Sequence, residues 1–279
     1  MSEPSKPKTP DDTHNRFIAR MDRELMGWDD PVARLRAALD NDELELYCQP
    51  ILSLARAGGY PMGEILVRLR EEEQAMLPPG DFLPVFEHYG MLPELDRWVV
   101  RHAVALLAAG AALPRFSINV SGPTLHDKGF PAFVAASLAA SGVAGRALVF
   151  EIEEADMIER AEAVAVFASA MRDAGCSLLF DGFGRRSVSF APLKALGFGF
   201  VKVDGAIIRQ LTRSKVALSK MNAVVKVGNE IGVAVIAECI EDDDTLGLIR
   251  SIGAGFAQGF GIALPEPVSR VAAQHGRKR

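Results

Sequence analysis

The chain has 279 residues, 49% of them hydrophobic and 24% charged, so it can fill a large core as two small domains or one α/β barrel. A formal net charge of −5 gives no sign of a nucleic-acid-binding surface, and three widely spaced cysteines are typical of buried thiols in a reducing compartment. The longest apolar stretch, residues 103–113, is too short to cross a membrane, and the polar N-terminus lacks a signal-peptide core. We therefore expect a cytoplasmic protein with no membrane span and no nucleic-acid partner.

Helical and strand-like patterns follow one another along most of the chain. Residues 1–28 are predicted to form a flexible tail with a short helix at 13–26, and Asp30-Pro31 predicts the start of a helix over 31–39. Further helices are predicted at 94–107, 131–140, 161–174 and 215–231. Apolar runs predict strands at 44–51, 62–68, 115–120, 147–152, 177–181, 198–203, 232–237 and 255–260.

Eight strands that alternate with helices predict an α/β fold of the (β/α)8 barrel type, with a doubly wound sheet as the alternative. The barrel domain is predicted to span residues 29–270. Residues 271–279 are predicted to form a basic C-terminal tail.

Polar residues stand at or near the ends of seven predicted strands, where barrels carry their active sites. A single one would most simply be a solvated rim residue, but the recurrence favours a site. Oxygen ligands that converge there would hold Mg²⁺ or Mn²⁺, and the lack of clustered histidine and cysteine argues against zinc. In chain order these residues are Glu64, Arg68, Asn119, Glu151, Glu153, Glu154, Asp181, Lys202, Asp204, Glu238 and Gln258.

Nine short motifs occur in an order that resembles one family, the EAL-domain phosphodiesterases of cyclic-di-GMP signalling. They are YCQPI at 47–51, EILVR at 64–68, the segment 79–100, NVS, FEIEE, DGFG, VKVD, AECIE and QGF. The resemblance covers about residues 43–267. It implies a (β/α)8 barrel with one antiparallel strand, cleavage of cyclic-di-GMP to pGpG with two Mg²⁺ or Mn²⁺ ions, and a homodimer formed near the fifth and sixth strands.

The resemblance also implies a role for each matching residue. The first metal would be held by Glu64, Asn119, Glu151 and Asp181. Lys202 would position the attacking water or stabilise charge at phosphorus, and Glu238 would help to hold the second metal. Ligand contacts would come from Gln49, Pro50, Leu66 and Arg68, with Gln258 in support, and Glu154 would anchor the loop after the fifth strand.

The motif DGFG departs from the family pattern, which has a second aspartate at the place of Gly182. That aspartate is a ligand of the second metal, so the resemblance implies one metal site and leaves the second without one of its ligands. Glu153 is the only nearby new carboxylate in the sequence, and it is the candidate substitute for that ligand. Arg185 and Arg186 replace Thr and Gly, and they would be solvated, grip a ligand phosphate or contact a partner.

Three functions remain open on these residues. The first is a degenerate EAL domain that binds cyclic-di-GMP with weak or absent hydrolysis. The second is a working phosphodiesterase, and the third is a nucleotide-independent module that binds a protein partner. If the missing ligand alone prevents hydrolysis, Gly182→Asp should raise activity.

Overall fold

The computed structural model describes residues 30–55, 59–70, 76–77, 79–186 and 189–275. They form two compact units. The first unit contains the described residues up to Glu45 together with Val67–Leu95, and the second contains Leu46–Leu66 and the described residues from Asp96 onward. The predicted helix at 13–26 lies outside the described residues.

The first unit contains helix α2 (Pro31–Asp40), helix α3 (Pro79–His88), strand β3 (Met76–Leu77) and the end of β2 (Gly59–Arg70), which pairs antiparallel with β3. The Asp30 carboxylate accepts a hydrogen bond of 3.0 Å from the Ala33 amide, so the predicted start of α2 is confirmed. Phe82 and Phe86 in α3 are fully buried and meet edge to face.

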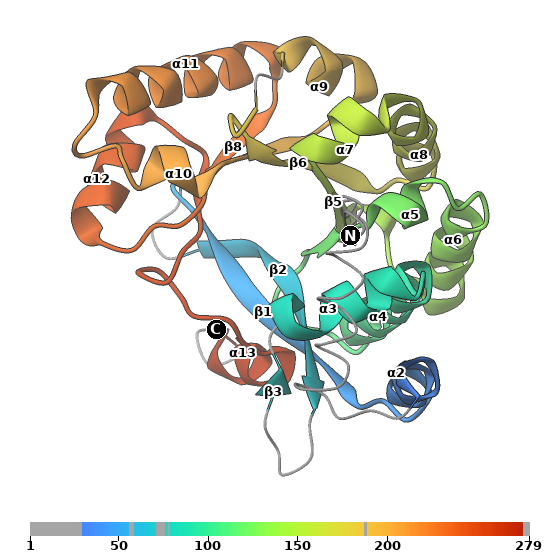
Figure 1. The fold of residues 1–279 in the computed structure, drawn as a ribbon. Coiled ribbons are helices and arrows are strands. Elements are labelled where there is room, and N and C mark those ends of the chain that lie inside the picture. The colour runs from blue at the N-terminus through green and yellow to red at the C-terminus, as the bar shows by residue number, and fades with distance from the viewer. Residues whose placement is uncertain (1–29, 56–58, 71–75, 78, 187–188, 276–279) are drawn as a thin grey trace, which may run out of the picture. The chain divides into compact units, whose positions relative to one another are not determined.

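The second unit contains a closed ring of strands (Figure 1). Neighbours β2, β4, β5, β6, β7, β8 and β9 are parallel, while β1 pairs antiparallel with β9 and also pairs with β2 to close the ring. This confirms the predicted barrel with one antiparallel strand, and the doubly wound alternative is wrong. The remaining strands are β1 (Leu44–Ser53), β4 (Phe116–Asn119), β5 (Leu148–Glu153), β6 (Ser177–Phe183), β7 (Phe200–Val203), β8 (Ala234–Ala237), β9 (Phe256–Ala257) and β10 (Glu266–Pro267), which adds to β1.

Helices connect the strands and lie around the outside of the ring (Figure 1). They are α4 (Leu92–Ala108), α5 (Gly122–Leu125), α6 (Phe130–Ser141), α7 (Glu154–Glu159), α8 (Ala161–Asp173), α9 (Phe190–Leu196), α10 (Gly205–Ile208), α11 (Lys215–Ile231), α12 (Asp243–Ile252) and α13 (Val268–His275). The four helices predicted between residues 94 and 231 are confirmed to within two residues. Helix α13 includes the first part of the segment predicted as a tail. No helix in the described ranges is long and apolar enough to span a bilayer.

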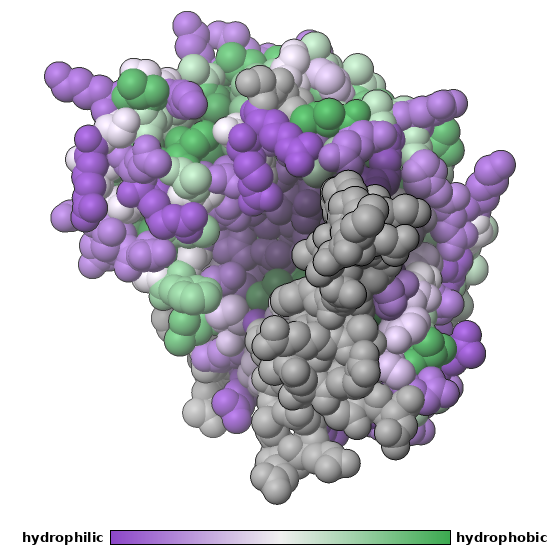
Figure 2. All heavy atoms as spheres, viewed as in Figure 1, coloured by the Kyte–Doolittle hydropathy of each residue, from purple (hydrophilic) through white to green (hydrophobic). Residues whose placement is uncertain are grey.

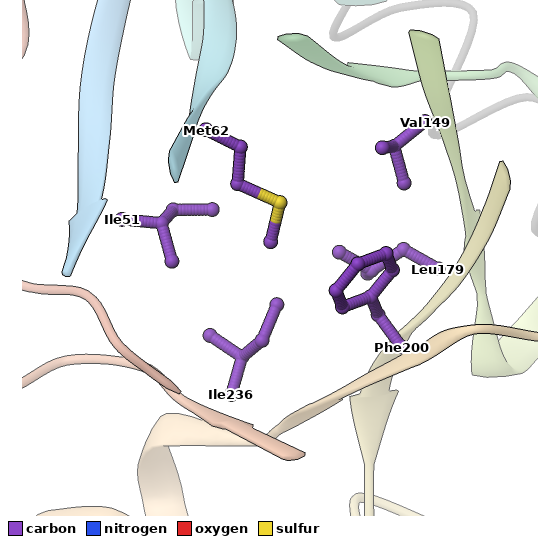
Figure 3. Close-up of a cluster of buried hydrophobic side chains, with 6 residues drawn as sticks. All are labelled: Ile51, Met62, Val149, Leu179, Phe200 and Ile236. Atoms are coloured by element: carbon purple, nitrogen blue, oxygen red, sulfur yellow. The ribbon is translucent and has the colours of Figure 1, made fainter. Parts of the chain in front are cut away.

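The interior of the ring contains an apolar layer of six side chains that point toward one another (Figure 3). Five of the six strands concerned run parallel to one another, so equivalent positions on them lie at one level of the barrel. The layer is nearly inaccessible to water and forms a floor for the residues that follow on the same strand faces. It consists of Ile51, Met62, Val149, Leu179, Phe200 and Ile236.

Candidate active site

A layer of polar side chains follows the apolar layer toward the carboxyl ends of the parallel strands. Successive side chains of a strand alternate between its two faces, so a residue two positions on shares the face of the first. Glu151 thus follows Val149, Asp181 follows Leu179, and the antiparallel β1 presents its polar residue before Ile51. The polar layer consists of Gln49, Glu64, Asn119, Glu151, Asp181, Lys202, Glu238 and Gln258. The face drawn in Figure 2 is hollowed over the ring of strands, and hydrophilic residues line the hollow.

Lys202 lies at the centre of the polar layer. Its Nζ donates hydrogen bonds to Glu151 Oε2 at 2.6 Å and to Glu64 Oε2 at 3.0 Å, and it lies 3.9 Å from Asp181 Oδ1. The lysine and Glu151 are both almost completely buried. An ammonium flanked by apolar strand residues requires partners of opposite charge. Three carboxylates, from β2, β5 and β6, are the partners of Lys202.

Side-chain amides fix the orientation of the Glu64 carboxylate. Asn119 Nδ2 donates to Oε1 at 3.0 Å, and Gln258 Nε2 donates to Oε2 at 2.8 Å. Gln258 also lies 3.2 Å from Gln49 Oε1, and Gln49 donates to the backbone carbonyl of Ala263 at 3.0 Å. Four of the predicted site residues therefore form one connected network, which holds Glu64 in a single position.

Burial and mutual repulsion distribute the charge among these groups. Burial together with repulsion from Glu64 raises the pKa of Glu151 to about 8. Burial also acts to raise the pKa of Glu64, but attraction to Lys202 and the hydrogen bond from Gln258 outweigh it and lower that pKa. Burial opposes the charge of Lys202, yet Glu151, Glu64 and Asp181 hold its pKa well above the usual value. The site thus keeps its lysine charged and has an excess of carboxyl groups over cations.

Three side-chain oxygens of the polar layer are buried and accept no hydrogen bond from the described residues: Glu151 Oε1, Asp181 Oδ1 and Gln258 Oε1. The two orphaned carboxylate oxygens, beside the Glu64 carboxylate and the Asn119 amide, have the donor chemistry that a hard divalent cation requires. Within the described ranges, no three Asp, Glu, His or Cys groups already stand as a preformed cage for an ion. Lys202 contacts the carboxylates instead, so cation binding requires Glu64 and Glu151 to share their oxygens between the lysine and the ion.

Gly182 follows Asp181 in β6 with a positive φ of 73°, a conformation that glycine adopts readily. A Cβ at this position would lie 3.6 Å from the guanidinium carbon of Arg185. Arg185 Nε donates to Asp204 Oδ2 at 2.7 Å, and the arginine side chain is 61% exposed. An arginine cation therefore stands beside the glycine, bound to the residue that begins α10.

Glu154, the buried first residue of α7, holds the loop that follows β6. Its carboxylate accepts hydrogen bonds from the backbone amides of Gly184, at 3.4 Å, and of Arg186. The Arg186 side chain points to a different partner and donates to Glu159 at 3.2 Å. Glu238 accepts a hydrogen bond of 2.6 Å from the Gly205 amide, where β8 approaches the start of α10.

Comparison with known proteins decides the family. The model of the EAL domain family matches residues 32–265, which is most of the chain. The chain belongs to the EAL domain family.

Relatives of this EAL domain include proteins named cyclic-di-GMP phosphodiesterases. PdeF of Escherichia coli is 27% identical over 262 residues, covering 93% of this chain and 35% of PdeF. NbdA of Pseudomonas aeruginosa is 30% identical over 239 residues, covering 84% of this chain and 30% of NbdA. The chain therefore spans about a third of the length of these curated relatives. Among solved structures, the FimX EAL domain of Pseudomonas aeruginosa, bound to cyclic-di-GMP, has a TM-score of 0.79 at 25% identity and covers 85% of this chain and 96% of its own.

The EAL barrel brings together most of the residues that the sequence singled out. Pro50 is buried in β1 and Leu66 is half-buried in β2. Arg68 lies in the first unit, where its NH1 donates to the Val67 carbonyl at 2.9 Å, and its contact with a ligand stays a prediction. Asp204, expected from the sequence as a strand-end acid, is also the partner of Arg185, and this role was not predicted. Its place directly after a predicted strand was the available signal.

Proposed function

We propose that this EAL domain binds cyclic-di-GMP through one divalent cation and hydrolyses it weakly or not at all. One observation carries the proposal. The position after Asp181 has no side-chain oxygen, and the Arg185 guanidinium carbon lies 3.6 Å from where a Cβ of that residue would stand. A second cation would meet a positive charge there in place of a carboxylate.

Nucleotide binding is supported by the completeness of the polar layer. Glu64, Asn119, Glu151 and Asp181 offer oxygen ligands to one Mg²⁺ or Mn²⁺ ion, and two of their buried oxygens accept no hydrogen bond from the part of the chain that the structure describes. A cation bound there would polarise a phosphate oxygen of the nucleotide. The solved complex of the FimX EAL domain with cyclic-di-GMP supports the same ligand class for this chain. Gln49, Pro50, Leu66 and Arg68 are the proposed ligand contacts, with Gln258 in support.

Weak hydrolysis is supported by the chemistry of two-metal sites, which stabilise the attacking and the leaving oxygen together. Glu238 would be a ligand of a second ion, but the neighbouring acid in β6 is Asp181, which already serves the first ion. Loss of the second ion removes several kcal/mol of transition-state stabilisation. Because each 1.36 kcal/mol is tenfold in rate, the expected loss is about a thousandfold or more.

A specific observation favours the working phosphodiesterase as the second candidate. Glu153 is in register with Asp181 on the neighbouring strand and shares its strand face with Glu151. Burial and repulsion from Asp181 raise the pKa of Glu153, which is the behaviour of a carboxyl close to another acid. Glu153 is therefore the residue that would complete a second metal site if hydrolysis is retained.

Three further parts of the proposal rest on the family resemblance and stay predictions. They are a single EAL domain over residues 29–270, assembly as a homodimer, and a cytoplasmic location. A nucleotide-independent module that binds a protein partner is the reading that remains if the domain ignores cyclic-di-GMP.

Calorimetric titration with cyclic-di-GMP, in the presence of Mg²⁺, Mn²⁺ or Ca²⁺, tests the proposal when the recovered nucleotide is separated on a column. Binding with intact nucleotide is the expected result. Conversion to pGpG at a substantial rate would establish the second candidate, and Glu153→Gln should then abolish it. Absence of both heat and conversion would overturn nucleotide binding. Asp181→Asn is the matched variant that should bind weakly, and Glu159→Gln, outside the polar layer, should bind like the wild type.

A further inference from the structure

The two arginines of the loop after β6 are not equivalent. Arg186 directs its side chain to Glu159 at 3.2 Å, away from the polar layer. Arg185 is held by Asp204 through Nε alone, at 2.7 Å. Within the described part of the chain, the terminal nitrogens of Arg185 donate to no other protein atom, and the side chain is 61% exposed. The Nε end of the Arg185 guanidinium is therefore fixed, and its two terminal nitrogens remain available as donors to a ligand.

The surroundings of Arg185 are acidic on the side of the site. Attraction to Asp204, and also to Asp181 and Glu153, raises the pKa of the guanidinium although burial acts against it. Asp181 belongs to the polar layer, so the guanidinium lies next to the proposed cation ligands. A planar guanidinium with one edge fixed is preorganised for a phosphate oxygen, because few rotamers are lost on binding.

Gly182 leaves room beside the guanidinium. A Cβ at residue 182 would lie 3.6 to 3.8 Å from the Arg185 guanidinium atoms, in ordinary van der Waals contact, so a longer side chain directed toward Arg185 would compete for the same space. The charge is also matched. A carboxylate at residue 182 with a divalent cation would add one net positive charge, and glycine with Arg185 adds one as well.

We propose that Arg185 takes the place of a second cation and binds a phosphate oxygen of the nucleotide with its two terminal nitrogens. This inference rests on the proposed binding of cyclic-di-GMP. It assigns a phosphodiester-binding role to the substitution that removes hydrolysis: an arginine neutralises phosphate charge but supplies no activated water. The domain is then a one-cation binding site with its second positive charge built into the chain.

The experiment is calorimetric titration with cyclic-di-GMP at one Mg²⁺ concentration for four proteins: wild type, Arg185→Ala, Arg186→Ala and Asp204→Asn. Arg185→Ala should bind cyclic-di-GMP about tenfold more weakly than the wild type, because it loses a charged hydrogen bond at an exposed site. Arg186→Ala should match the wild type. Asp204→Asn removes the ion pair with Arg185 but keeps the guanidinium. The asparagine oxygen can still accept the hydrogen bond from the Ala206 amide that caps the helix. The affinity of this variant for cyclic-di-GMP should therefore stay within about threefold of the wild type.

The outcomes separate this inference from the proposed function. Wild-type binding that Arg185→Ala leaves unchanged overturns the inference and leaves the proposed function standing. Equal losses of affinity in Arg185→Ala and Asp204→Asn would show that Arg185 only holds the loop in place, and this result also overturns the inference. No binding by the wild type overturns both. Thermal unfolding of each variant shows whether the fold is kept, and a shallower fall of affinity with salt in Arg185→Ala separates a direct phosphate contact from a change in stability.

Discussion

Lys202 and Glu151 form an ion pair of 2.6 Å between Nζ and Oε2, with 2% and 0% of the two side chains exposed. Glu64 shares the same ammonium at 3.0 Å. The desolvation of these groups is offset by their attraction and by the amides that bind Glu64. Removal of the shared cation therefore leaves buried carboxylates that face one another without compensation.

The first prediction follows from this arrangement. Lys202→Met should lower the free energy of unfolding by about 3–5 kcal/mol in the presence of a chelator, because breaking a buried pair strands its partners. Mn²⁺ should restore more stability to the variant than to the wild type, since the carboxylates then gain a cation. Urea unfolding with and without Mn²⁺ measures both effects. Lys215→Met, at an exposed lysine of α11, is the control and should be close to neutral. Equal behaviour of the two variants would contradict the central role of Lys202.

The second prediction concerns metal stoichiometry. Titration with Mn²⁺, followed by electron paramagnetic resonance of the free ion, should show one bound ion per chain in the presence of cyclic-di-GMP. Asp181→Asn should weaken this binding, because Asp181 Oδ1 is a buried carboxylate oxygen that accepts no hydrogen bond from the described residues. Two ions of similar affinity per wild-type chain would contradict the prediction and favour Glu153 as a ligand.

The third prediction separates Gly182 from Arg185. An aspartate at residue 182 must adopt a φ near 73°, which costs about 1 kcal/mol, and its carboxylate would begin beside the Arg185 guanidinium. Gly182→Asp alone should therefore form an ion pair with Arg185 and gain little hydrolysis. The double variant Gly182→Asp with Arg185→Thr should bind a second Mn²⁺ and produce pGpG faster.

The control for that comparison is the double variant Gly182→Asp with Arg186→Thr, which changes the same residue types but leaves Arg185 in place. It should behave like the single variant. If Gly182→Asp alone restores rapid hydrolysis, the guanidinium is no obstacle, and the missing oxygen ligand alone explains the weak activity.

The barrel and much of its polar layer could be predicted from the sequence, since strands buried on both faces appear as apolar runs and carry their polar residues at the carboxyl ends. Short helices could not be predicted. Helix α10, residues Gly205–Ile208, is a single turn, and one turn contains no periodic pattern. The Arg185–Asp204 pair could not be predicted either, because it depends on the path of the loop that follows β6.

The fourth prediction concerns a buried carboxylate outside the site. Asp96 Oδ2 accepts hydrogen bonds from the Ser121 amide at 3.0 Å, the Ser121 hydroxyl at 2.7 Å and the Thr124 hydroxyl at 2.6 Å. These bonds tie α4 to the start of α5. Burial nevertheless raises the pKa of Asp96 above its ordinary value, because it outweighs the hydrogen bonds that favour the charged form.

A raised pKa in the folded state means that the folded chain binds a proton more tightly than the unfolded chain. The stability that this proton contributes is fully present below the unfolded pKa of about 4 and is lost as the pH rises through the folded pKa. The free energy of unfolding of the wild type, relative to Asp96→Asn, should therefore fall as the pH rises from about 4 through the folded pKa. Urea unfolding at several pH values measures this difference, in which all other titrating groups cancel.

Asp127 supplies a control of opposite sign. Burial acts to raise its pKa, but the hydrogen bonds from Arg97 and from the Gly129 amide outweigh it and lower that pKa. The stability of the wild type relative to Asp127→Asn should accordingly be present above the unfolded pKa and be lost as the pH falls. If the two differences in free energy of unfolding change with pH in the same direction, the pKa of Asp96 is not raised in the folded state. The hydrogen bonds from Ser121 and Thr124 would then outweigh its burial.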